Sequence, residues 1–199
     1  MAKPPLIAAV VLAAGLSRRF GPGDKLAQIV EGKPLALHIA ETLASMDFAT
    51  RIAVCSTRSG TLPDALADLG FEIVVNPSPE AGQGSSLALA IKSALAAKAN
   101  GALVTLADMP FVSRRHLDAM IARWHLDLES IVASVAIPYF GPPALFPSSR
   151  FAELTALSGD RGARHLLANA TLIPAGPDEL RDFDVPADFG PPEESGRSA

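Results

Sequence analysis

Basic side chains lie close to glycines in the stretch "VVLAAGLSRRFGPGDKL", residues 10–26. Gly15 ends an apolar run, and Arg18 and Arg19 follow it. Lys25 comes after two further glycines. Cations beside a flexible backbone are suited to holding an anion such as a phosphate group. A tight turn with solvated cations is the alternative interpretation, but Lys25 and the second pair of glycines favour phosphate.

A carboxylate comes directly after a second apolar run. Asp108 follows "ALVTLA", and a carboxylate at the end of a buried strand is costly unless it is paired, hydrogen-bonded or bound to a cation. A helix N-cap just before Pro110 is the alternative. Mg²⁺ is typically held by one or two carboxylates together with substrate phosphates, so a second acid is expected. The stretch "DFDVPAD" offers Asp182, Asp184 and Asp188, of which the first two would share one face of a strand.

Other familiar motifs are absent from the sequence. It contains neither G-x-x-x-x-G-K-[ST] nor G-x-G-x-x-G, and no G-x-S-x-G. The four histidines are scattered without metal-ligand spacing, and Cys55 is the single cysteine, which excludes an internal disulfide. A formal net charge of −4 gives no general attraction to nucleic acid, so a small phosphorylated ligand fits better.

The compartment is predicted from what the sequence lacks. No secretory signal is apparent at the N-terminus, and no apolar run approaches the roughly 20 residues of a membrane span. We therefore expect a soluble cytoplasmic protein without membrane partners.

The elements that must position these residues alternate along the chain. Apolar runs predict strands over residues 6–14, 51–56, 71–76 and 101–110. Helical spacing predicts helices over residues 33–46, 61–70, 85–99 and 113–126, the last of them capped by Ser113. A hairpin over 130–149, helices over 151–158 and 161–169, and a last strand over 180–186 complete the prediction.

This order predicts an α/β fold. Repeated β-α units imply a Rossmann-like three-layer sandwich, with a mostly parallel sheet between two layers of helices. Ligands of such folds bind beyond the carboxyl ends of the strands, where the Gly15 turn and Asp108 are expected. We expect a single domain over residues 1–189. Residues 190–199, "GPPEESGRSA", are expected to form a disordered tail.

Five motifs in this order carry a resemblance to a known family: "LAAGLSRRFGPGDKL", "NPSPEAGQGSSL", "LADMP", "LSGDRGARHLL" and "DFDVPADF". Over about residues 6–189 the chain resembles the molybdenum cofactor cytidylyltransferases and their nucleotidyltransferase relatives. The resemblance implies a sheet of the glycosyltransferase-A-like nucleotidyltransferase type. It also implies transfer of CMP from CTP to the terminal phosphate of a molybdopterin-type cofactor, with Mg²⁺ as cofactor and pyrophosphate as the leaving group.

The resemblance also implies roles for particular residues. Arg19, Lys25 and Asp108 would be catalytic, and Asp108 and Asp184 would bind the metal. Arg18, which is adjacent to Arg19 in sequence, is expected on that ground alone to face the solvent. In "GDRGAR", Asp160, Arg161 and Arg164 would clamp the acceptor phosphate; the alternative is a helix start capped by Asp160. The nucleotide would be contacted by Leu12, Ala13, Ala14, Gly15, Ser17, Arg19, Lys25, Gly82, Ser86 and Asp108.

Several alternatives stay open at this level. Guanylyltransferase relatives tend to have Ala-Gly-Gly where this chain has Ala13-Ala14-Gly15, which favours cytidine. The compact "YFGPPALF" and Val185, where relatives often have threonine, leave the acceptor less defined. A guanylyltransferase, a transferase acting on a sugar or alcohol phosphate, and a non-catalytic carrier of the finished cofactor are the alternatives. A recipient molybdoenzyme is a further partner, with an exposed apolar patch at "YFGPPALF" as its expected docking surface.

Overall fold

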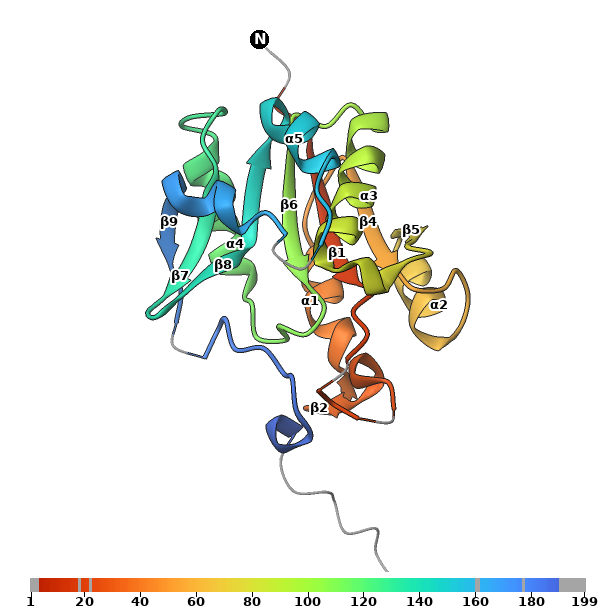
Figure 1. Ribbon diagram of the computed structural model, residues 1–199. Helices are drawn as coiled ribbons and strands as arrows, with labels where there is room; N and C mark the ends of the chain where they lie inside the picture. The colour runs from red at the N-terminus through yellow and green to blue at the C-terminus, as the bar shows by residue number, and fades with distance from the viewer. Residues whose placement is uncertain (1–3, 18, 22, 160–161, 177, 190–199) are drawn as a thin grey trace, which may run out of the picture.

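A seven-stranded sheet forms the middle of the molecule in the computed structural model, which describes residues 4–17, 19–21, 23–159, 162–176 and 178–189 (Figure 1). The strands follow the order β5-β4-β1-β6-β8-β7-β9 across the sheet. Their bounds are β1 Ile7–Ala13, β4 Thr50–Cys55, β5 Glu72–Val75, β6 Gly101–Leu106, β7 Val132–Ala136, β8 Tyr139–Pro147 and β9 Thr171–Pro174. Two short strands, β2 (Ile29–Val30) and β3 (Lys33–Pro34), pair separately and antiparallel.

Most neighbouring strands run parallel, as predicted. β1 pairs in parallel with both β4 and β6, and the pairs β4–β5 and β7–β9 are also parallel. β8 is the exception, since it runs antiparallel to both β6 and β7. The continuous apolar sequence of β1 follows from its central place, where the helices cover both faces of the sheet.

Helices cover the two faces of the sheet. On one face, α1 (Leu35–Ala44), α2 (Thr61–Asp68) and α4 (Arg114–Trp124) pack in the same core cluster as Ala9 and Val11 of β1. On the other, α3 (Gln83–Ala96) and α5 (Phe151–Thr155) pack with Ala8 and Val10 (Figure 1). The alternation of these side chains along β1 divides the core into two, which confirms the three-layer sandwich.

The C-terminal part differs from the prediction in two places. The helix expected over 161–169 is a 3-10 helix, η4, at Arg164–Asn169. The strand expected over 180–186 is absent: β9 is the last strand of the described residues, and the chain beyond it reaches a 3-10 helix, η5 (Pro186–Phe189), without regular structure. This segment meets the chain just beyond β6 through the hydrogen bond from the N–H of Phe183 to the carbonyl oxygen of Asp108, and it pairs with none of the strands of the sheet within the described residues. The expected tail, residues 190–199, lies outside the described residues.

The stretch "YFGPPALF" is not an exposed patch. It forms most of β8, which lies between β6 and β7. Residues 143–147 are buried, whereas Tyr139 and Pro142 are partly buried. Phe140 is its exposed apolar side chain. For most of the stretch the expectation was wrong, because the strand is an inner one, covered by α4 on one face and by α5 and η4 on the other. Exposed large apolar side chains remain only around the hairpin tip among the described residues here, at Ile137 and Phe140. None of the described helices combines the length and the apolar character that a membrane crossing requires.

Candidate functional site

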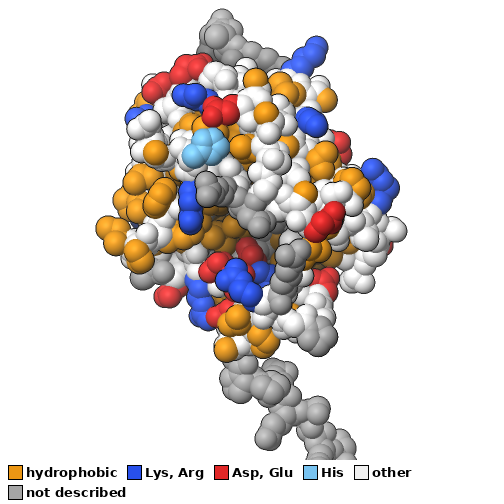
Figure 2. All heavy atoms as spheres, viewed as in Figure 1, with side chains coloured by type: hydrophobic (Ala, Val, Ile, Leu, Met, Phe, Trp, Pro, Cys, Tyr) orange, Lys and Arg blue, Asp and Glu red, His pale blue; other side chains and the backbone are white. Residues whose placement is uncertain are grey.

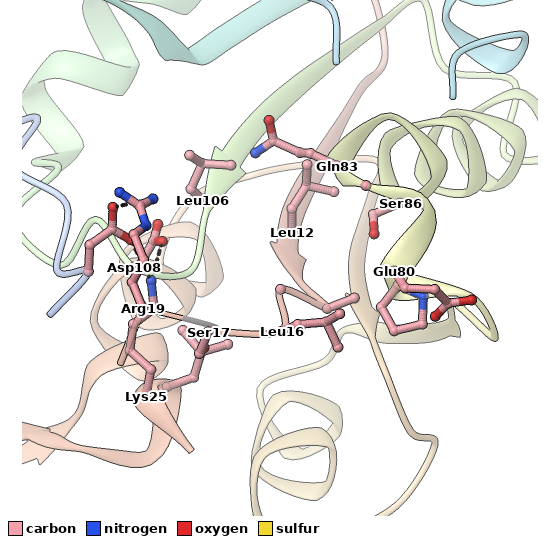
Figure 3. Close-up of a pocket in the computed structure, with 16 residues that line it drawn as sticks. Leu12, Leu16, Ser17, Arg19, Lys25, Glu80, Gln83, Ser86, Leu106 and Asp108 are labelled. Atoms are coloured by element: carbon pink, nitrogen blue, oxygen red, sulfur yellow. Dashed lines mark hydrogen bonds and ion pairs between the residues drawn. The ribbon is translucent and has the colours of Figure 1, made fainter. Parts of the chain in front are cut away.

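A cavity of about 360 Å³ opens where the carboxyl ends of β1 and β6 meet the N-terminus of α3 (Figure 3). β1 pairs in parallel with β4 on one side and with β6 on the other. The helices that precede these two strands, α1 and α3, cover opposite faces of the sheet, so the end of β1 is the switch point at which ligands of such folds bind. We call this space the first cavity. It is lined by Leu12, Ala14, Gly15, Leu16, Ser17, Arg19, Lys25, Leu26, Pro79, Glu80, Gly82, Gln83, Ser86, Leu106, Asp108 and Asp184.

Lys25 joins two carboxylates in this cavity. Its Nζ donates to Oδ2 of Asp108 at 2.8 Å and to Oδ1 of Asp184 at 3.0 Å. Lys25 begins a 3-10 helix, η1 (Lys25–Ala27), whose N-cap Asp24 accepts a hydrogen bond from the backbone of Leu26. Burial alone would lower the pKa of Lys25, but the charges and hydrogen bonds of the two acids outweigh it and raise that pKa. The ammonium group is therefore charged at neutral pH.

A second cation approaches the same acids from the solvent side. Nη2 of Arg19 lies 2.8 Å from Oδ2 of Asp184, and 75% of the Arg19 side chain is exposed. The exposed part of the guanidinium group can therefore still bind a phosphate that enters the first cavity. In Figure 2 acidic and basic side chains gather below a hollow on this face, and hydrophobic side chains lie above them.

One carboxylate oxygen in this group has no hydrogen-bond partner. Oδ1 of Asp108 is buried, and no described residue donates a hydrogen bond to it. A buried, unpartnered oxygen beside a second carboxylate fits a divalent cation that prefers oxygen ligands. No group of three or more His, Cys, Asp or Glu side chains within the described ranges is arranged around a metal position. Two protein carboxylates completed by substrate phosphates are the arrangement typical of Mg²⁺.

The backbone places Asp184 opposite Asp108. The N–H of Phe183 donates to the carbonyl oxygen of Asp108 at 3.1 Å, which ties the two segments together. Asp188 then fixes the turn: its Oδ2 accepts hydrogen bonds from the N–H groups of Asp184 at 2.7 Å and Val185 at 2.8 Å. These hydrogen bonds, that from Val185 first, lower the pKa of Asp188.

Asn76 organises the other wall of the first cavity. This buried side chain follows β5, and its Nδ2 donates to the hydroxyl oxygens of Ser85 and Ser86, each at 2.9 Å. Its Oδ1 accepts a hydrogen bond from the backbone of Ser78 at 3.0 Å. The loop between β5 and α3 is thereby held against the first turn of α3, where Gly82 adopts a φ of 88° that favours glycine.

A close backbone contact connects α3 with the loop that follows α5. The N–H of Gly84 donates to the carbonyl oxygen of Gly159 at 3.0 Å. A Cβ atom on Gly84 would lie 2.9 Å from that oxygen and 3.0 Å from the carbonyl carbon of Ser158. Only glycine permits this approach, which brings Gly159, the first residue of the "GDRGAR" motif, beside the start of α3.

A second cavity of about 420 Å³ adjoins the first. Leu12, Gln83 and Leu106 line both, so the two cavities meet at the ends of β1 and β6 and at the first residue of α3. The lining of the second cavity is mostly apolar. It consists of Leu12, Gln83, Leu87, Val104, Leu106, Met109, Tyr139, Phe140, Gly141, Pro142, Ala144, Phe146, Ala163, Arg164, Leu167 and Asp182.

Asp182 and Asp184, the two candidates for the second acid beside Asp108, line different cavities. Asp184 lines the first cavity beside Asp108, whereas Asp182 lines the second. Burial, followed by the charges of Asp184 and Asp108, raises the pKa of Asp182. Burial also raises the pKa of Tyr139, and the charges of Asp182 and Asp108 add to that effect.

Most of the sequence-predicted site residues come together. Leu12, Ala14, Gly15, Ser17, Arg19, Lys25, Gly82, Ser86, Asp108 and Asp184 line the first cavity. Ala13 does not, because it is 7% exposed and packs in the core beneath α1. Arg164 lines the second cavity. Arg18, Asp160 and Arg161 lie outside the described residues.

Sequence reasoning did not single out several lining residues. Gln83 and Glu80 stand inside the motif "NPSPEAGQGSSL", and Tyr139 lies in "YFGPPALF", but nothing in their types marked them. The Gly15 turn leads into a loop and the short 3-10 helix η1, and α1 begins at Leu35, so any backbone N–H groups that the turn offers to phosphate come from a loop.

Comparison with known proteins identifies the class. The sequence profile of the MobA-like NTP transferase domain matches residues 9–175, and the chain belongs to that nucleotidyltransferase family. The matched part ends before Asp182 and Asp184. The purine catabolism protein PucB of Bacillus subtilis is 32% identical over 200 residues, covering 94% of this chain and 96% of PucB. A molybdenum cofactor guanylyltransferase of Rhodopseudomonas palustris is 30% identical over 144 residues, covering 68% of this chain and 62% of that protein.

Solved structures share the fold. Rv0371c from Mycobacterium tuberculosis superposes with a TM-score of 0.77 at 22% identity, covering 94% of this chain and 97% of that one. A nucleotidyl transferase from Methanothermobacter thermautotroptrophicus gives a TM-score of 0.72 at 21% identity, covering 92% and 94%. These likenesses confirm an α/β nucleotidyltransferase fold with a mostly parallel sheet.

Proposed function

We propose that this chain transfers CMP from CTP to the terminal phosphate of a molybdopterin-type cofactor and releases pyrophosphate. The observation that carries the proposal is the group formed by Lys25, Arg19, Asp108 and Asp184 at the rim of the first cavity. It combines two cations for a triphosphate with two carboxylates for a metal. The adjoining second cavity leaves room for an acceptor at the point where the nucleotide's α-phosphate would lie.

Positioning and charge compensation would account for most of the rate. A phosphate monoester is largely ionised near pH 7, because its second pKa is about 6, so the acceptor needs little help from a general base. Lys25 and Arg19 would orient the triphosphate and offset the charge that develops on the departing pyrophosphate. Asp108 and Asp184 would hold Mg²⁺, which when bound supplies charge stabilisation at the phosphate oxygens. A structure of Rv0371c from Mycobacterium tuberculosis is described as a complex with manganese, which supports a divalent ion as cofactor.

The donor nucleotide has two candidates. Ala14 lines the first cavity, at a position where guanylyltransferase relatives tend to have glycine, which favours cytosine as the base. Five similar proteins, by contrast, are named molybdenum cofactor guanylyltransferases, which supports GTP as the second candidate.

The test is pyrophosphate release by the purified protein with molybdopterin and Mg²⁺, comparing CTP, GTP, ATP and UTP. Release with CTP alone, lost in Asp108→Ala, supports the proposal. Release with GTP instead would assign the chain to the guanylyl branch. A lack of release with every donor, although the finished dinucleotide cofactor binds, would favour the non-catalytic carrier.

A further inference from the structure

Four phenylalanine rings join three segments that are far apart in the sequence. Phe111 follows β6, and its ring packs against the ring of Phe183 with the centroids 5.7 Å apart. Phe183 packs against Phe189 at 5.1 Å, and Phe189 packs against Phe20 at 5.4 Å. All three pairs meet edge to face, at interplanar angles between 64° and 71°, an arrangement that aromatic rings prefer. We call these four side chains the phenylalanine row.

The row lies beside an ion pair of the first cavity. Phe20 follows Arg19 in the sequence, and Phe183 precedes Asp184. Arg19 and Asp184 form an ion pair at 2.8 Å. Because the ring of Phe189 contacts both Phe20 and Phe183, it joins the chain neighbours of the two ion-pair partners. In Figure 1, η5, at the dark blue end of the described chain, lies beside the loop that follows β1.

Phe20 anchors the loop between β1 and η1. Gly21 and Gly23 in this loop adopt φ values of 88° and 130°, and glycine loses more conformational freedom on ordering than any other residue. The Arg19 side chain is 75% exposed, and an ion pair in contact with water contributes little to the position of a loop. Phe20 is partly buried, so the packing of its ring against Phe189 supplies an apolar contact that holds the loop in place.

The aromatic contact matters most when Arg19 binds a phosphate. A phosphate at the guanidinium group competes with Asp184 for the same N–H donors, so the ion pair loosens as the phosphate binds. The contact between Phe20 and Phe189 involves no charge and persists while Arg19 changes partner. A side chain that is held in place beforehand loses less entropy on binding, and the affinity for the phosphate rises accordingly.

We propose that Phe189 is a positioning residue for nucleotide binding, and that through Phe20 it holds Arg19 where the triphosphate of the donor binds. Phe189 itself is not part of the described lining of either cavity. Asp188, the residue before it, fixes the turn of Asp184 through two N–H groups, so the same short helix orders an acid and a cation of the first cavity. The inference rests on the nucleoside triphosphate donor of the proposed function.

The test compares the binding of CTP, GTP, CMP and GMP to the full chain with Mg²⁺, by isothermal titration calorimetry. The ratio of triphosphate to monophosphate affinity reports on the phosphate end, since both ligands share the base and the ribose. We expect Phe189→Ala to lower this ratio by about tenfold, the effect of one lost charge-assisted contact. Phe189→Tyr retains the ring and should retain the ratio. Phe48→Ala is the matched control, because Phe48 is also partly buried against the core but precedes β4, at the end of the sheet away from the first cavity.

A double variant tests whether Phe189 acts through Phe20. Phe20→Ala should lower the same ratio, and the double variant should lower it no further than either single variant. Thermal denaturation shows which variants are folded, and Phe20→Ala provides the measurement if Phe189→Ala does not fold. Additive losses in the double variant would overturn the inference. So would an unchanged ratio in a folded Phe189→Ala or Phe20→Ala variant, since the rings would then only stabilise the fold.

Failure of the proposed function gives a different pattern. The ratio for CTP or GTP then depends on Phe189 and Phe20, yet no donor releases pyrophosphate with molybdopterin. Nucleotidyl transfer to molybdopterin with a ratio that is independent of both rings would leave the proposed function standing and remove the inference.

Discussion

The backbone N–H of Phe183 donates to the carbonyl oxygen of Asp108, 75 positions earlier in the chain, at a distance of 3.1 Å. Side chains alternate along an extended segment, so the neighbours of Phe183 point away from it, and Phe183 itself is 3% exposed in the core. Asp184 enters the first cavity and Asp182 the second. One hydrogen bond thus places one acid in each of two adjoining cavities.

Replacing Asp184 and Asp182 by asparagine, each in a separate variant, should distinguish their roles. Asp184→Asn removes a charge beside Asp108, so we expect the Mg²⁺ concentration for half-maximal pyrophosphate release to rise by about tenfold. Asp182→Asn should leave that concentration unchanged and alter the dependence on acceptor instead. Metal titrations of both variants at saturating nucleotide check this. An equal shift in metal requirement for both variants would contradict the assignment of the acids.

Lys25 should stabilise the fold most when no metal is present. Lys25→Met leaves Asp108 and Asp184 facing each other without the cation that joins them, and we expect the free energy of unfolding to fall by about 2 kcal/mol. Mg²⁺ should restore part of the loss. Thermal denaturation with and without Mg²⁺ measures both effects. Lys33→Met is the matched control, because the Lys33–Glu41 pair is exposed and should contribute little. A loss in Lys25→Met no larger than in this control would refute the prediction.

Gly84 should tolerate no side chain. Gly84→Ala would place a Cβ atom 2.9 Å from the carbonyl oxygen of Gly159, which is backbone and cannot rotate away. We expect a loss of about 1–3 kcal/mol in unfolding free energy and a raised KM for nucleotide, because the start of α3 must shift. Gly176→Ala meets only the side chain of Glu179, at 3.6 Å, and serves as control. Denaturant unfolding that gives the same stability for both variants would show that the loop yields.

Glu179 should make the stability depend on pH in the acid range. Burial opposes its charge, but hydrogen bonds from Ser113 and the N–H of Gly176 outweigh this and lower its pKa. Since the folded pKa lies below the unfolded one, the stabilisation is present above about pH 4.5 and is lost as the pH falls through the folded value. Glu179→Gln should therefore cost about 1 kcal/mol at pH 7 and less at pH 3. Urea unfolding across this range measures it, and a cost that grows toward low pH would have the wrong sign.

Ala14 should influence the choice of donor. Ala14→Gly removes a methyl group from the lining of the first cavity and makes room for a purine. We expect the ratio of kcat/KM for CTP to that for GTP to fall by roughly tenfold, the effect typical of one methyl group in a binding pocket. Steady-state pyrophosphate release with each nucleotide provides the ratio. An unchanged ratio would mean that other residues select the base.

The sequence alone determined the layered fold and most of the first cavity. Continuous apolar strands and amphipathic helices alternate along the chain, and such a pattern buries its apolar surface well in a three-layer sandwich. The Gly15 turn and Asp108 could be assigned to one edge of the sheet because both follow strands that run parallel. Ser113 was correctly predicted as the cap of α4, since N-capping depends on a few neighbouring residues.

Only the tertiary structure decided which side chains lie opposite the Gly15 turn and Asp108. Asp182 and Asp184 are two positions apart, and a local pattern cannot show that an irregular segment beyond β9 crosses the end of β6. Gln83 and Tyr139 both line the second cavity because elements distant in sequence pack together there. Such contacts depend on how helices and strands pack. The second cavity lies between β8 and the start of α3, which are far apart in the sequence, so no local sequence pattern predicts it.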